Sequence, residues 1–161
     1  MTQPPVDPPL AATSRPPLDP NLAATSRPPL DPHLAAIMRE VVEPGGHGGG
    51  RFGHREHIHL AFIAARRGDA AGLLRGWIRQ IAASHGTPDR YHETITTAWA
   101  QIVVHHIRAA PGISDFDAFA ARFPALLDKT LLTRHYSPAA LASPAARATW
   151  LAPDLTPIPS Q

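Results

Sequence analysis

The chain of 161 residues contains no cysteine, and lysine occurs only once, at Lys129. Without cysteine the protein can form no disulfide, and it has neither a thiolate nucleophile nor a thiolate metal ligand. No apolar run approaches the roughly 20 residues that a membrane-spanning helix requires, so no membrane contact is expected. Any metal or acid–base site must therefore use histidine, carboxylate or hydroxyl side chains.

Strong charge of one sign is also absent. Fifteen basic residues stand against 13 acidic ones, which gives a formal net charge of +2, and no block of like charge occurs. Nucleic-acid binding is therefore not favoured, because both a basic stripe and a recognition helix are missing. Residues 1–5 lack the basic and apolar regions of a secretory signal, so a cytoplasmic location is expected. The length favours a single folded domain.

The first quarter of the chain is a short proline-rich repeat. Residues 7–18 read DPPLAATSRPPL, residues 19–30 read DPNLAATSRPPL, and residues 31–36 read DPHLAA. Paired prolines favour extended chain and the period is too short for a solenoid, so residues 1–30 are predicted to be a disordered arm. A polyproline ligand for a partner module is the functional alternative. Residues 31–53 are predicted to form a short helix capped by Asp31 and a glycine-rich loop.

From His54 onward the apolar pattern is helical, and no segment alternates as a strand does. The fold is predicted to be all-α, a single bundle of about five or six helices over residues 54–152 with an irregular tail at 153–161. The expected helices cover residues 54–67, 69–84, 88–109 and 114–123, a segment that starts at Pro124, and a last short segment that Ser137 opens.

A helical wheel divides segment 54–67 into two faces. His54 and His57 lie on the side that also carries Ala61 and Ala64, and this side is predicted to face inward. The side predicted to face solvent carries Arg55, Glu56, His59, Arg66 and Arg67.

Segment 88–109 divides in the same way. The side predicted to face inward carries His92, Thr96, Trp99, Val103 and His106. The side predicted to face solvent carries Arg90, Thr97, Gln101 and Arg108, with Glu93 also turned outward.

Short connections make successive helices antiparallel, so segments 54–67 and 88–109 should begin at the same end of the bundle. His54, His57 and His92 would then converge. Neutral imidazole is the commonest metal ligand, and three histidines leave the open positions that a catalytic metal needs. The sequence therefore predicts a polar pocket, with a divalent transition metal (Fe, Zn, Cu or Mn) held by the three histidines as its most specific form.

The predicted catalytic residues are His57 and His92 as ligands or proton carriers, with Tyr91 and Thr96 as hydrogen-bonding groups. Trp99 would supply an apolar wall. The structural alternative is that these histidines are simply packed or hydrogen-bonded, since ten histidines in one chain produce coincidences.

Other polar residues have simpler interpretations. Glu56 and His59 match the Glu-x-x-His half of a di-iron motif, but no second copy exists and both are predicted to face outward. His106 and His135 favour a packing role, and His85 favours a role at a helix C-terminus. The remaining basic side chains near these helices are predicted to form a solvated face, namely Arg75, Arg79 and Arg90.

Two functions from different classes follow. The first is a small-molecule enzyme, either metal-dependent or acid–base, with a histidine-lined pocket at one end of the bundle. The second is a non-catalytic regulatory or protein-interaction module that would use the helical domain and the proline-rich arm for docking.

Two segments also resemble a known family. The first reads Phe52-x-His54-x-Glu56-His57-x-x-Leu60-Ala61-Phe62, and the second reads Tyr91-His92-Glu93-Thr94-x-Thr96-x-Ala98-Trp99. They are similar to the FHHxDHxxLAW-like and KYHETxT-like segments of a family of small, uncharacterised bacterial all-helical proteins, over about residues 52–157. Gly53 and Glu56 depart from that pattern, which often has histidine and aspartate there. The resemblance implies a shared site at His57 and His92 and implies no reaction.

Overall fold

The computed structural model describes residues 27–42 and 52–159. Within these two ranges the chain forms helices and no strand, which confirms the all-α fold. The described helices are α1 (Pro32–Val41), α2 (His54–Arg66), α3 (Ala70–Ser84), η1 (Pro88–Arg90), α4 (Glu93–Ala109), α5 (Phe116–Arg122), η2 (Pro124–Leu127), η3 (Lys129–Arg134), α6 (Pro138–Ala142) and α7 (Pro144–Ala148). Most of the predicted arm, and the glycine-rich segment 44–50, lie outside the described residues.

Short polar side chains begin the helices where the sequence predicts them. Asp31, Asp69, Asp115 and Ser137 each accept a hydrogen bond from a backbone N–H of the first turn of α1, α3, α5 and α6, respectively. Such caps satisfy donors that the helix itself leaves without a partner. The boundaries were therefore predictable from local chemistry alone.

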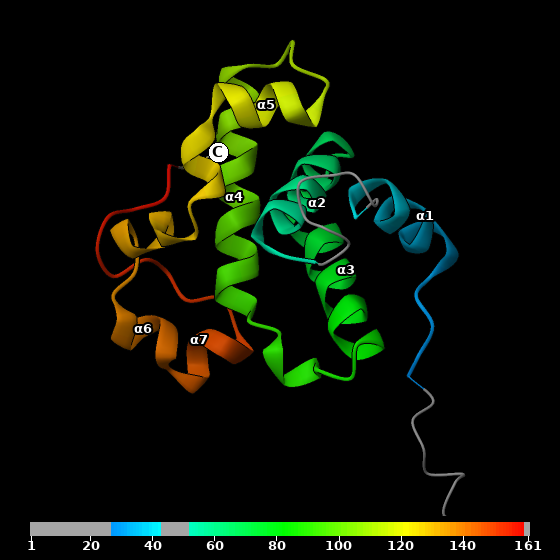
Figure 1. Cartoon of the computed structure of the whole chain (residues 1–161). Helices are drawn as coiled ribbons and strands as arrows, with labels where there is room; N and C mark the ends of the chain where they lie inside the picture. The colour runs from blue at the N-terminus through cyan, green and yellow to red at the C-terminus, as the bar shows by residue number, and fades with distance from the viewer. Residues whose placement is uncertain (1–26, 43–51, 160–161) are drawn as a thin grey trace, which may run out of the picture.

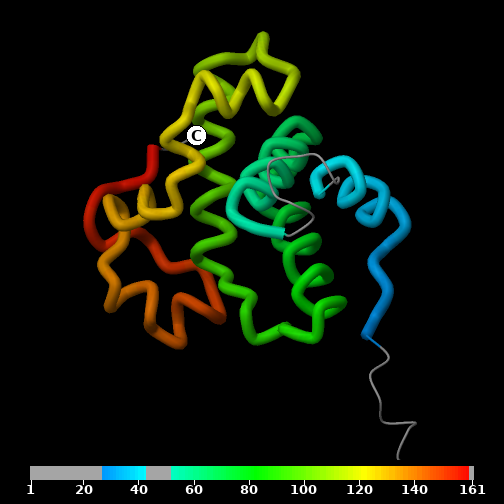
Figure 2. The backbone as a smooth tube through the Cα atoms, in the orientation of Figure 1, coloured from blue at the N-terminus to red at the C-terminus, as the bar shows by residue number. Residues whose placement is uncertain are grey.

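Helix α4 runs through the middle of the molecule (Figure 1). It packs against α2 and α3 on one side and against α7 on the other, while α5 crosses its far end. Figure 2 shows that the chain after α7 returns along the outside of η3. Because other elements surround α4, nearly every side chain from His92 to Val103 is buried.

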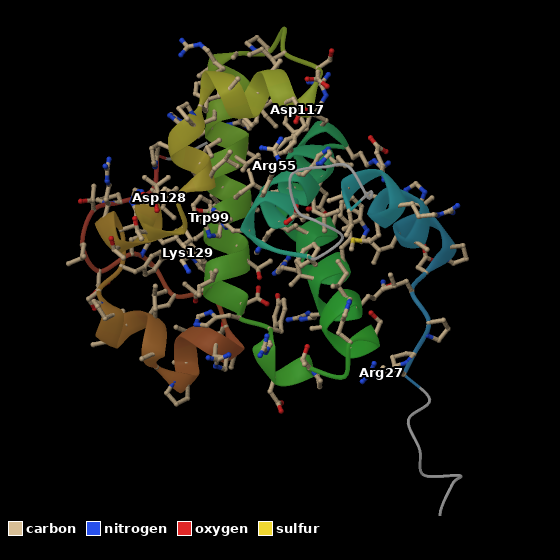
Figure 3. The ribbon with its side chains drawn as sticks, in the orientation of Figure 1. Arg27, Arg55, Trp99, Asp117, Asp128 and Lys129 are labelled. Carbon is tan, nitrogen blue, oxygen red and sulfur yellow. The ribbon has the colours of Figure 1, made fainter. Side chains whose placement is uncertain are left out.

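Helices α2 and α5 also contact each other directly. Arg55 of α2 forms an ion pair with Asp117 of α5, which faces it in Figure 3, and the Arg55 guanidinium lies 5.1 Å from the centre of the Phe116 ring.

Among the described residues, no helix has both the length and the apolar character needed to cross a bilayer.

Two predicted helices were wrong in their extent. The segment that starts at Pro124 is not one α-helix but two 3₁₀ helices, because the Asp128 side chain caps Thr130 N and restarts the chain there. The segment predicted to start at residue 88 forms the short η1 first, and α4 begins only at Glu93, with His92 as its N-cap. A further short helix, α7, follows the last predicted one.

Three outward assignments were also wrong. Glu56, Glu93 and Thr97 are only 5–8 % exposed. Each has its polar atoms satisfied inside the protein: Glu56 Oε2 accepts from Gly53 N at 2.8 Å, and Thr97 Oγ1 donates to Glu93 Oε1 at 3.3 Å. A helical wheel assigns polar residues to solvent and cannot register partners that other elements supply.

Candidate functional site

A pocket of about 660 Å³ lies where α3 ends and α4 begins, with His57 of α2 in its wall. Its apolar lining comes from Phe52, Ile78, Ile81, Ala82 and Ile95, and its polar lining comes from His57, His85, Thr87, Arg90, Tyr91, His92 and Thr96. The volume is in the range of small-molecule sites, and an apolar wall with a few polar groups is their usual composition. Four predicted site residues, His57, Tyr91, His92 and Thr96, therefore share one cavity.

His57 differs from the other polar groups of this pocket. Its Nε2 atom is buried and has no hydrogen-bond partner within the described part of the chain. Burial, reinforced by the positive potential of nearby His54, lowers the pKa of His57 to about 4. The imidazole is therefore neutral near pH 7. A buried polar atom without a partner costs about 1–3 kcal/mol, so this nitrogen is a candidate contact for a ligand.

His92 has both ring nitrogens engaged by the backbone. Its Nδ1 accepts from Ile95 N at 3.3 Å, as an N-cap, and its Nε2 lies 2.9 Å from Leu141 O. Because a carbonyl oxygen only accepts, Nε2 must carry the proton. This fixed tautomer joins the start of α4 to α6 and makes His92 a structural wall of the pocket.

Tyr91 and Thr96 contribute differently to the lining. The Tyr91 hydroxyl donates to Glu93 Oε2 at 2.7 Å, and the Arg79 guanidinium lies 4.6 Å from the centre of the tyrosine ring. Burial and the hydrogen bond to Glu93 raise the pKa of Tyr91 above its ordinary value. Tyr91 thus presents its ring rather than a reactive phenolate. Thr96 is 2 % exposed and lies within the same wall.

Glu93 is the residue that sequence reasoning missed. Its carboxylate accepts from Arg75, Arg79, Tyr91 and Thr97. Burial alone would raise the pKa of Glu93, but these hydrogen bonds and the two guanidinium charges lower it below its ordinary value. A signal was present in the sequence, because Arg75 and Arg79 are four residues apart and share one helix face. Their side chains remain 43 % and 57 % exposed, as a solvated face requires, and they also pair with Glu93.

His54 lies apart from this pocket. Its Nε2 is 3.0 Å from Leu126 O, and its ring is tilted against Trp99 with centroids 4.7 Å apart. Burial lowers the pKa of His54 more than the hydrogen bond to Leu126 raises it. Trp99 therefore packs against His54, and neither residue is part of the pocket wall.

The three predicted metal ligands are consequently not assembled. Within residues 27–42 and 52–159, no group of three histidine, cysteine, aspartate or glutamate side chains is placed to hold a metal ion. The physical reason is that His54 and His92 each direct Nε2 at a backbone carbonyl of a different segment. The shared pocket was predicted, whereas the competing carbonyl partners were not visible in the sequence.

The other histidines mostly serve local structure. His85 Nδ1, His106 Nδ1 and His135 Nδ1 each lie 2.8 Å from a backbone carbonyl oxygen, as the packing interpretation predicts. His59 was predicted to face solvent, but it is half-buried and stacks on Phe116 with ring centroids 4.0 Å apart. Glu56 caps the start of α2, so the Glu-x-x-His match is a capping feature.

Comparisons of the chain with protein families, with characterised proteins and with solved structures gave no significant match. The resemblance drawn from the two histidine-containing segments therefore stays a prediction.

Proposed function

We propose that the protein is a small-molecule enzyme whose substrate occupies the pocket at the start of α4 and contacts His57. The observation that carries the proposal is the buried Nε2 of His57, which has no partner among the described residues although its side chain lines the cavity. Five other described histidines each place a ring nitrogen within hydrogen-bond distance of a backbone carbonyl oxygen, so that nitrogen serves local structure: His54, His85, His92, His106 and His135. Among the described residues, His57 Nε2 is the one buried side-chain nitrogen or oxygen without a hydrogen-bond partner, and a ligand in the pocket would supply that partner.

The chemistry of His57 is that of a neutral imidazole. One ring nitrogen of a neutral imidazole donates and the other accepts, so His57 can orient a substrate hydroxyl or amine and take up its proton during reaction. Tyr91 and His92 are positioning residues in this proposal, because their polar atoms are engaged by Glu93 and by the backbone. Thr96 is proposed as a hydrogen-bonding group of the wall.

The proposal requires no metal ion. Of the three histidines predicted as ligands, His57 and His92 line the pocket and His54 does not. A divalent metal at His57 would need further ligands from the substrate or from residues outside the described ranges. Acid–base chemistry needs only the imidazole itself.

The second function, a protein-interaction module, has less support from the described surface. Leu155, at 56 % exposure, is the one large hydrophobic side chain that the described residues expose. A docking module would be expected to present a contiguous apolar stripe.

The test is affinity selection from a mixture of small metabolites, followed by mass spectrometry. The full-length wild-type protein and His105→Gln, a matched change at an exposed histidine of α4, should retain the same compounds. His57→Gln should lose them or retain far less. Each retained compound is then incubated with protein, and its conversion by the wild type but not by His57→Gln supports an enzyme.

Two outcomes would overturn the proposal. Retention that is identical in wild type and His57→Gln would remove His57 from the site. Retention that depends on His57, but with no compound converted, would make the protein a small-molecule binding module instead of an enzyme.

A further inference from the structure

Charge is distributed unevenly around the pocket at the start of α4. Its lining includes Arg90 and no aspartate or glutamate. Asp89, directly before Arg90, is exposed and does not line the pocket. Glu93, on the α4 side, already accepts hydrogen bonds from Arg75, Arg79, Tyr91 and Thr97. Among the described residues, the lining therefore carries the positive charge of Arg90 and no carboxylate.

Arg90 is well placed to use this charge. It is exposed, and within the described ranges it takes part in no ion pair. Arg147 stabilises the turn that carries Arg90, because Arg147 Nη1 donates to Asp89 O at 3.0 Å and to Tyr91 O at 3.4 Å. The backbone on both sides of Arg90 is thus fixed while its guanidinium stays accessible.

A second cation lies near the same rim. A Cβ atom added to Gly86 would come within 3.1 Å of Arg27 Nε, so the Arg27 side chain lies over the turn between His85 and Thr87. Figure 3 places Arg27 beside the end of α3. Since His85 and Thr87 both line the pocket, positive charge approaches the rim from two directions.

The same pocket also has an apolar lining, which comes from Phe52, Ala82 and three isoleucines, Ile78, Ile81 and Ile95. A ligand that suits both parts carries a negative charge at one end and an apolar body at the other. The Arg90 guanidinium matches the two oxygens of a carboxylate bidentately, and Arg90 is the one charged side chain among the described lining residues.

We propose that the pocket takes a small organic carboxylate with an apolar chain or ring, its carboxylate at Arg90 and its body against Ile78, Ile81 and Ile95. This inference rests on the proposed function, because it names the class of ligand for the same cavity. It makes Arg90 the residue that determines specificity and leaves His57 to contact the remainder of the ligand.

The experiment compares two matched probes, hexanoate and hexanamide, by NMR titration of the full-length protein. They have similar size and differ in charge. The wild type should bind hexanoate about tenfold more tightly than hexanamide, which corresponds to about 1.4 kcal/mol. Arg90→Gln should bring the two dissociation constants to within about twofold of each other, and Arg90→Lys should keep part of the preference, because it retains charge without the bidentate geometry. Thermal melts establish that each variant is folded.

Arg108→Gln is the matched control, since Arg108 is an exposed arginine near the other end of α4 and does not line this pocket. It should keep the tenfold preference. Equal affinity for the two probes in the wild type, binding of neither, or a preference that survives Arg90→Gln would each overturn the inference. None of these results would contradict the proposed function if His57→Gln still abolished retention of some other compound. Loss of that dependence would contradict the function itself.

Discussion

Glu93 and His57 are both buried near one pocket, because His57 and Tyr91 line it and the Tyr91 hydroxyl donates to Glu93. Their polar atoms differ in whether the protein supplies hydrogen-bond partners. The Glu93 side chain is 6 % exposed and accepts hydrogen bonds from four side chains of α3 and α4 and the residues between them. The Nε2 atom of His57 is buried with no partner in the described residues. One group is charged and fully satisfied, and the other is neutral and unsatisfied.

The difference separates a structural polar cluster from a candidate site. A buried carboxylate is tolerated when donors compensate for the loss of water, and the Glu93 cluster meets that condition. An unsatisfied buried nitrogen is costly unless something outside the protein satisfies it. The same reasoning places His92, whose two ring nitrogens are both engaged, with Glu93 rather than with His57.

The largest effect is expected from Glu93→Ala. The change should lower the free energy of unfolding by about 3 kcal/mol, because Tyr91 and Thr97 lose their acceptor and two arginines lose their counter-charge. The effect is at the low end for a buried charge, since the Arg75 and Arg79 side chains remain 43 % and 57 % exposed. Urea denaturation followed by circular dichroism measures it. Glu40→Ala, at an exposed carboxylate of α1, should change the free energy by less than about 0.5 kcal/mol.

A second expected effect is a loss of stability in acid that depends on His57. The pKa of His57 is about 4 in the fold and about 6.5 in an unfolded chain, so the unfolded state binds more protons between these values. Stability is therefore complete above about pH 6.5 and falls as the pH is lowered, by about 2 kcal/mol from pH 7.5 to pH 5. His57→Gln should remove this part of the slope, and His105→Gln should retain it. Equal slopes in all three proteins would show that His57 is not buried in neutral form.

His92 should matter for stability more than for binding chemistry. His92→Ala is expected to lower the free energy of unfolding by about 1–2 kcal/mol, because α4 loses its N-cap and Leu141 O loses its donor. His92→Asn should lose less, since asparagine is also a good N-cap. Thermal melts with denaturant controls would compare the two variants, and equal losses would mean that the cap contributes nothing.

The smallest effect is expected at His57 itself near neutral pH. His57→Leu replaces an unpartnered polar atom with apolar surface, so stability should change by no more than about 1 kcal/mol and in the direction of a gain. The same melts measure it. A loss as large as that of His92→Ala would show that His57 Nε2 has a structural partner, and the contrast with Glu93 would disappear.

Local chemistry made much of the fold predictable. Asp31, Asp69 and Asp115 each cap a helix where the sequence indicates a start, and the apolar pattern identifies α2, α3 and α4. The pocket was also predictable in outline, because short connections place the starts of α2 and α4 close enough for His57 and His92 to line one cavity.

The polar partners were not predictable from one helix at a time. Glu93 is satisfied by Arg75 and Arg79, which precede it by 18 and 14 residues, and His54 is satisfied by Leu126 O, 72 residues later. A helical wheel describes a helix with one dry face, whereas α4 is enclosed on most of its circumference. In the described residues, the three predicted metal ligands are not grouped for the same reason, because His54 and His92 are hydrogen-bonded to the backbone carbonyls of Leu126 and Leu141.

The hydrogen bonds from Arg147 to the backbone on both sides of Arg90 affect the order in which the pocket forms during synthesis. Arg147 reaches back 58 residues to Asp89 O, and Thr94 Oγ1 donates to Thr149 O and accepts from Leu151 N. A ribosome that has already released α2, α3 and α4 has not yet released the residues that hold the rim in place. The nascent chain should therefore gain its helices first and its affinity for a ligand last.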